Sequence, residues 1–278
     1  MKRAARVDAE VKRLEGIARK LRRRVLDMIF KAQAGHVGGS FSSAEMLACL
    51  YFRVMKIDTA RPDWPDRDRL LISKGHCCPI YYAALAERGY FPVKALDTYD
   101  ECDSILEGHP DIRTPGVDMS SGSLGLGLSA GVGLALGARQ LKKDFHTYVL
   151  IGDGECQSGN IWEAAMSAAK YGLGNLTAIV DKNLLQVTGF LKDVMPIDPL
   201  KEKWEAFNWR AIEIDGNNIK EVLDALTQCR KDPDRPSVII AKTVKGKGVS
   251  FMENSPNWHA KIISRDEYDR AIMELDNV

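Results

Sequence analysis

The chain has 278 residues, of which 45% are hydrophobic and 28% charged, and its formal net charge is +1. These values are typical of a soluble globular protein, and the near-neutral charge argues against a general nucleic-acid or membrane-surface binder. The six cysteines form no CxxC pair, and no stretch reaches about 20 apolar residues, which disfavours a disulfide framework, a zinc cluster and a membrane span. We therefore expect a cytoplasmic protein with reduced thiols.

The first half of the sequence predicts mainly helices. Apolar residues recur at helical spacing over residues 8–33, and the basic residues there leave no room for the apolar region of a signal peptide. Further helices are expected over 43–56 and 74–90, and a loop-rich segment over 100–123. Small residues dominate 124–142, which predicts a tightly packed, buried helix.

Strands and helices alternate in the second half. Strand patterns cover 146–152, 175–183, 209–215 and 237–243, with helices expected over 159–172 and 221–229. This alternation predicts an α/β fold with a mostly parallel sheet and helices on both faces. We expect one domain over 1–278, with a helical segment over 1–33 and a peripheral, charged tail over 255–278.

Two polar residues follow neighbouring predicted strands. Asp153 and Asn183 each stand just past a strand end, and the 30-residue step between them fits one βαβ unit. Right-handed crossovers bring both strand ends to the same sheet edge, where α/β proteins bind ligands. A carboxylate and an amide oxygen there suit a hard cation such as Mg²⁺, and the backbone carbonyl of Leu185 is a candidate third ligand. Gly152 and Gly154 would let a phosphate approach the backbone.

Several motifs extend this pattern along the chain. They are AGHVGGSFSS, LISKGH, EGHP, SGSLGLGLSAGVGLA, GDGECQSGNIWEA, DKNLLQVTG and KGKGVSFMENSPNWH. Together they span roughly residues 15–262 and resemble the N-terminal, diphosphate-binding half of the transketolase family. The resemblance implies a thiamin-diphosphate-binding fold, with thiamin diphosphate and Mg²⁺ (or Ca²⁺ or Mn²⁺) as cofactors. It implies transfer of a two-carbon ketol unit from a ketose to an aldose.

The resemblance also implies roles for individual residues. Histidines at four matching places would bind substrate and help proton transfer, and a glutamate in the same family couples paired active sites. The implied catalytic residues are His36, His76, His109, His259 and Glu163. The implied cofactor contacts are His76, Gly122, Ser123, Leu124, Gly152, Asp153, Gly154, Glu155, Asn183, Leu185 and His259. The implied metal ligands are Asp153, Asn183 and Leu185. His146, the fifth histidine, precedes a predicted strand and receives no role.

Two departures from the family pattern qualify the resemblance. Ser158 stands where many members carry an acid, so the proton network through Glu163 would be shortened or rerouted. We expect the pyrimidine-binding domain and its catalytic glutamate on a separate subunit, in an α2β2 assembly without which the chain would not turn over a sugar substrate. The contact surface is expected to be apolar around 108–135 and 155–170.

Alternative functions stay open at this point. A nicotinamide-dependent dehydrogenase is disfavoured because GLGLSAG follows no predicted strand. A non-catalytic subunit is disfavoured by the retained Asp153, Asn183 and histidines. Another thiamin enzyme, either a deoxyxylulose-phosphate-type synthase or a decarboxylating ketoacid enzyme, is the main alternative, together with a transketolase-like chain for a specialised anionic ketose. Cys77 and Cys78 are interpreted as small packing residues.

Overall fold

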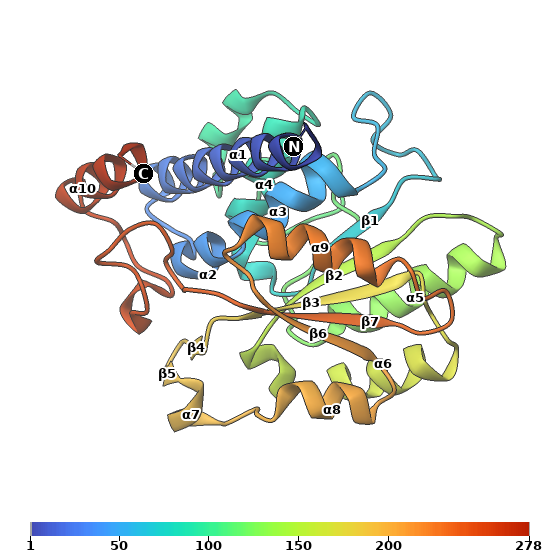
Figure 1. Cartoon of the computed structure of the whole chain (residues 1–278). Coiled ribbons are helices and arrows are strands. Elements are labelled where there is room, and N and C mark those ends of the chain that lie inside the picture. Colours follow the sequence, from blue (N-terminus) through green and yellow to red (C-terminus); the bar gives the residue numbers. More distant parts are fainter. Residues whose placement is uncertain (1, 278) are drawn as a thin grey trace.

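A five-stranded parallel sheet forms the centre of the molecule. The computed structural model describes residues 2–277, with side chains described from residue 7 onward (Figure 1). The strand order is β1-β2-β3-β7-β6. The strands are β1 (Arg69–Ile72), β2 (Thr147–Gly152), β3 (Leu176–Lys182), β6 (Arg210–Asp215) and β7 (Ser237–Lys242). All four pairings between neighbours are parallel, so the predicted α/β fold class is confirmed.

Helices cover both faces of this sheet (Figure 1). One face carries α1 (Lys2–Ala32), α3 (Ala44–Cys49), α4 (Cys78–Arg88) and α9 (Ile219–Cys229). The other carries α5 (Leu126–Gln140), α6 (Gly159–Lys170) and α8 (Leu200–Ala206). Successive residues of β2 serve the two faces in turn, because Tyr148 and Leu150 join one hydrophobic cluster while Val149 and Ile151 join the other.

Helix α5 lies close against β2, as its small residues predict. A Cβ atom at Gly131 would stand 2.4 Å from Val149 Cγ2, whereas one at Gly133 would meet nothing within 4 Å. The helix therefore needs glycine on the face toward the sheet, and only there.

The structure refines the predicted elements of the N-terminal half. The expected helix over 43–56 is α3 followed by a π-helical turn over Leu50–Val54, and a short α2 (Val37–Ser42) precedes it. The helix expected over 74–90 begins as a 3₁₀ turn at Gly75–Cys77 and continues as α4. It ends at Gly89, whose φ of +97° is left-handed.

Strand β1 and several short elements were absent from the prediction. β1 has four residues and pairs in parallel with β2, and no local sequence pattern predicts this pairing. The short elements are a hairpin of β4 (Leu185–Gln186) and β5 (Gly189–Phe190), then α7 (Leu191–Val194) and α8. Further 3₁₀ turns cover Val93–Thr98, Gly154–Gln157 and Pro256–Trp258.

The C-terminal segment, expected as a charged tail, contains a helix that packs on α1. Ser264 and Glu267 form a reciprocal capping box at the start of α10 (Arg265–Asp276). Tyr268 stacks on Phe30 with ring centroids 4.3 Å apart, and its hydroxyl donates to Asp27 at 2.7 Å. The ends of the expected domain, residues 1 and 278, lie outside the described residues.

Strand register brings the polar residues to one edge. Gly152 pairs with Asp181, and Asp181 pairs with Ala241, so β2, β3 and β7 end side by side. Asp153 and Asn183 follow directly at that edge. Within residues 2–277, no helix is both long and apolar enough to cross a bilayer.

Candidate active site

A cavity of about 410 Å³ opens at this edge of the sheet. The structure brings together most of the residues that the sequence predicted for a site. The cavity is lined by His36, His76, His109, His259, Gly122, Leu124, Gly152, Asp153, Gly154, Glu155, Asn183 and Leu185. Ser123 and Glu163 are exposed and do not line it.

Three of the four histidines form a compact cluster. The ring centroids of His36 and His76 lie 5.0 Å apart, and that of His259 lies 5.4 Å from His36 and 5.3 Å from His76. The rings come from the loop before α2, from the turn after β1 and from the segment before α10. His109 approaches from the loop-rich segment, where a Cβ at Gly122 would touch its ring at 3.2 Å.

These imidazoles are neutral near pH 7. Burial lowers the pKa of His36 and of His76 to about 4 and that of His259 to about 3, and neighbouring positive charges act in the same direction. Burial also lowers the pKa of His109. A neutral imidazole has one donor and one acceptor nitrogen, so the cluster can both give and accept hydrogen bonds.

The predicted metal ligands meet on one turn of backbone. Asp153 Oδ2 accepts from the backbone N–H of Leu184 at 2.5 Å, and Asn183 Oδ1 accepts from that of Leu185 at 3.2 Å. Asp153 is 2% exposed, and burial, followed by the charge of Asp181, raises its pKa to about 7. A buried carboxylate whose charged form is disfavoured in this way is a place where a cation would be stabilised.

The donor set fits a hard cation. A carboxylate, an amide oxygen and a backbone carbonyl are the oxygen ligands that Mg²⁺ and Ca²⁺ accept. Among the side chains described, from residue 7 to 277, no group of three His, Cys, Asp or Glu is arranged to hold a metal.

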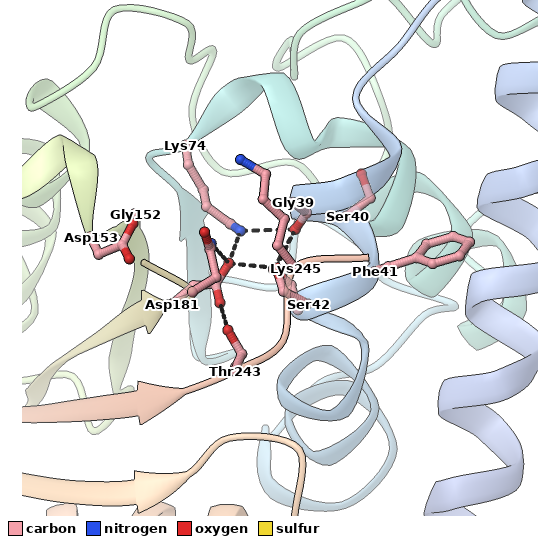
Figure 2. A network of polar contacts seen from close by, with 12 residues as sticks. Gly39, Ser40, Phe41, Ser42, Lys74, Gly152, Asp153, Asp181, Thr243 and Lys245 are labelled. Carbon is pink, nitrogen blue, oxygen red and sulfur yellow. Dashed lines mark hydrogen bonds and ion pairs between the residues drawn. The ribbon is translucent and has the colours of Figure 1, made fainter. Parts of the chain in front are cut away.

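Two buried lysines complete the cavity and were absent from the predicted site. Lys245 Nζ donates to the Leu185 carbonyl at 3.1 Å and lies 2.7 Å from His259 Nδ1. Burial lowers the pKa of Lys245. When Lys245 is protonated it can only donate, so Nδ1 is then the acceptor and the His259 proton sits on Nε2. Lys74 also lines the cavity and pairs with Asp181 at 2.5 Å (Figure 2). Both lysines lie within sequence motifs already singled out, SKGH and KGKG.

Glu155 lies at the cavity with its carboxylate already engaged by the protein. Oε1 accepts from the Ser73 hydroxyl and from the backbone N–H of Gly125 at 2.8 Å, and Oε2 accepts from Gly152 N–H at 3.0 Å. Glu155 therefore joins the turn after β1, the entry to α5 and the turn after β2. The contact with a cofactor that we expected of it stays a prediction.

Glu163 and Ser158 lie on α6 and at its start. Glu163 is exposed, and its role in coupling paired sites stays a prediction. Ser158 packs on Gly125, because a Cβ atom on residue 125 would stand 2.3 Å from the hydroxyl oxygen of Ser158. Glycine is therefore needed at position 125 to leave room for the Ser158 side chain.

Comparison with known proteins agrees with this geometry. The family described as transketolase, thiamine diphosphate binding domain, matches residues 14–275. The chain is 45% identical over 264 residues to the 6-deoxy-6-sulfo-D-fructose transketolase subunit SqwG of Clostridium sp. (strain MSTE9), covering 95% of this chain and 96% of that protein. It is also 45% identical to an apulose-4-phosphate transketolase subunit from Actinobacillus succinogenes, covering 94% of this chain and 95% of that one.

Longer transketolases match over part of their length. The transketolase structure from Campylobacter jejuni superimposes with a TM-score of 0.90 at 30% identity, and the match covers 95% of this chain and 42% of that one. This chain thus spans about two fifths of the length of such enzymes. The chain belongs to the transketolase family, and residues 14–275 are its thiamine diphosphate-binding domain.

Proposed function

We propose that this chain is the thiamine diphosphate-binding subunit of a two-chain transketolase that transfers a ketol unit from an anionic ketose to an aldose. One observation carries the proposal: a single cavity gathers four histidines beside a buried carboxylate, an amide and a carbonyl suited to a cation. The relatives that match over nearly their whole length are named as transketolase subunits, which favours ketol transfer over the decarboxylating alternative.

Asp153, Asn183 and the Leu185 carbonyl would hold Mg²⁺, or Ca²⁺ or Mn²⁺ in its place. The open backbone at Gly154, where a Cβ would meet nothing closer than 3.5 Å, leaves room for the diphosphate. Lys245 would turn from the Leu185 carbonyl toward the anion when the metal takes that oxygen. When bound, thiamine diphosphate supplies the electron sink for cleaving a bond next to a carbonyl.

The histidine cluster would form hydrogen bonds with the sugar substrate. Neutral His36 and His76 can donate to or accept from substrate hydroxyls, and His259, with its proton on Nε2 and Lys245 on Nδ1, is oriented to donate. His109 lies on a loop at the cavity mouth. Backbone atoms of Gly122, Ser123 and Leu124 would contact the cofactor beside it.

The partner subunit would cover an apolar surface next to the cavity. Large hydrophobic side chains are exposed within the two ranges predicted for the interface: Ile112, Leu124, Leu126 and Met166. An α2β2 assembly would place the exposed Glu163 at a contact between subunits. The partner would bring the pyrimidine-binding domain, its glutamate and the groups that read the substrate anion. The names of the relatives point to a sulfonated or phosphorylated ketose as donor.

The test is reconstitution of ketol transfer from this chain and its partner, with thiamine diphosphate and Mg²⁺. Donors would be xylulose 5-phosphate, a sulfonated ketose and a 2-oxo acid, with ribose 5-phosphate as acceptor. We expect a new ketose product only when both chains are present. Release of CO₂ from the 2-oxo acid without ketol transfer would refute the proposal.

Asp153→Ala should abolish Mg²⁺-dependent uptake of thiamine diphosphate by the assembly, because it removes the only carboxylate of the proposed metal site. The matched control is Asp193→Ala, an exposed acid on the nearby α7, which should leave uptake unchanged. Unchanged uptake in Asp153→Ala would remove this residue from the site.

His259→Ala should reduce turnover at least about 100-fold if it transfers or orients a proton. The control is the exposed neighbour Asn257→Ala, expected at the wild-type rate. A wild-type rate in His259→Ala, with the assembly intact by gel filtration, would exclude the role.

A further inference from the structure

Asp181 is a buried carboxylate that stands behind the cavity wall. It is 0% exposed and does not line the cavity. Four side chains donate hydrogen bonds to it: Lys74 Nζ at 2.5 Å, Ser42 Oγ at 2.7 Å, Asn183 Nδ2 at 3.1 Å and Thr243 Oγ1. Figure 2 shows Lys74, Ser42 and Thr243 converging on this one carboxylate.

The donors come from four separate segments of the cavity wall. They lie at the end of α2, just after β1, just after β3 and just after β7. Three of these segments carry a cavity residue nearby in sequence, namely His36, His76 and Lys245. Lys74 also donates to the Gly39 carbonyl at 2.9 Å, which ties α2 to the same point. Asp181 therefore holds together loops that are remote in the chain.

The hydrogen bonds identify Asp181 Oδ2 as an acceptor. Lys74 Nζ lies 2.5 Å from this oxygen and Ser42 Oγ lies 2.7 Å from it, and both donate. A further group that faces Oδ2 must therefore donate to it as well.

This requirement gives the side-chain amide of Asn183 a single orientation. Nδ2 donates to Asp181 Oδ2, while Oδ1 accepts from the backbone N–H of Leu185 at 3.2 Å. A flipped amide would place oxygen against oxygen at Asp181 and N–H against N–H at Leu185. Oδ1 keeps a second lone pair that can accept from or bind a further group. This oxygen lies at the same backbone turn as Leu184, whose N–H donates to Asp153.

We propose that Asp181 is a positioning residue for the metal centre: it fixes the Asn183 amide so that oxygen, and not NH₂, is available to the cation. The inference rests on the proposed function, in which Asn183 is a ligand. Asp181 itself touches neither metal nor substrate. Its contribution is the choice between two amide orientations that differ in ligand chemistry but hardly in shape.

The test measures metal affinity and not only activity. Mn²⁺ binding to the assembly with thiamine diphosphate is followed by the EPR signal of free Mn²⁺. Asp181→Ala removes both acceptor oxygens and should weaken Mn²⁺ binding about 10- to 100-fold, the usual loss when a partner of a metal ligand is removed. The matched control, Thr243→Val, removes another donor to the same carboxylate without touching Asn183, and Mn²⁺ affinity should stay within about twofold of wild type.

Wild-type affinity in Asp181→Ala would overturn the proposal, as would an equal loss in Thr243→Val, which would indicate a general effect on stability. If Asp181→Ala does not fold, hydrogen exchange of the Asn183 side-chain amide decides, measured by NMR on the full-length wild-type chain labelled with ¹⁵N-asparagine. The signal is assigned by its loss in Asn183→Ser. We expect exchange at least 10-fold slower than for the exposed Asn257; equal exchange would overturn the proposal. An assembly that takes up no Mn²⁺ would refute the proposed function, while the exchange experiment still decides the orientation of Asn183.

Discussion

The carboxylate of Glu155 offers a quantitative test of how the cavity is held together. It is 4% exposed and accepts from one hydroxyl and two backbone N–H groups. In Glu155→Gln, the amide oxygen can keep the Oε1 partners, but the NH₂ group then faces Gly152 N–H. One buried N–H loses its acceptor, which costs about 1–3 kcal/mol. The remaining bonds lose their charge assistance, about 0.5–1 kcal/mol each.

The sum is about 2–5 kcal/mol of the free energy of unfolding, with a central value near 3 kcal/mol. For a chain of this size, each kcal/mol shifts the melting temperature by about 2–4 °C, so Glu155→Gln should melt about 6–12 °C lower. Circular dichroism at a fixed protein concentration, on this chain without partner, measures the shift.

Glu163→Gln is the matched control, because it makes the same chemical change at an exposed acid on α6. An exposed substitution away from a network stays within about 0.5 kcal/mol, or about 2 °C. If the two variants melt within 2 °C of each other, the view that Glu155 holds three segments together is wrong.

Two further predictions concern packing and pH. Gly131→Ala should lower the melting temperature because the new methyl group meets Val149, whereas Gly133→Ala on the open side of α5 should raise stability by up to about 1 kcal/mol through helix propensity; the same sign of shift in both would contradict the packing. For His76, the pKa in the folded chain is about 4, below the ordinary 6.5, so its contribution to stability is present above pH 6.5 and is lost as the pH falls toward 4. At about 1.4 kcal/mol per pKa unit, the loss of stability approaches 3 kcal/mol. Denaturant unfolding at pH 7 and at pH 4.5 gives the change in the free energy of unfolding between the two pH values, and this change should be smaller for His76→Gln than for wild type. Equal changes in the two proteins would exclude the assignment of the low pKa to His76.

Much of the fold was predictable because its causes are local. Each of β2, β3, β6 and β7 is a run of apolar or β-branched residues, and the pattern alone indicates a strand. β1 escaped prediction because four residues between polar loops carry too little pattern, and only pairing with β2 makes them a strand. The capping box at Ser264 was readable in advance and would have indicated α10.

The sequence itself determined that Asp153 and Asn183 lie close together. Right-handed crossovers make the neighbouring strands parallel, and parallel strands have their carboxyl ends at the same edge of the sheet. The histidine motifs likewise indicated a cavity in advance through their resemblance to a family. The tertiary structure alone decided which polar groups face one another. Ser42 reaches Asp181 across 139 positions and Glu155 reaches Ser73 across 82, and such pairings depend on packing that no local pattern records. Burial is the physical reason. A carboxylate that is shielded from water needs hydrogen-bond donors from the protein, and the tertiary fold determines which donors lie next to it.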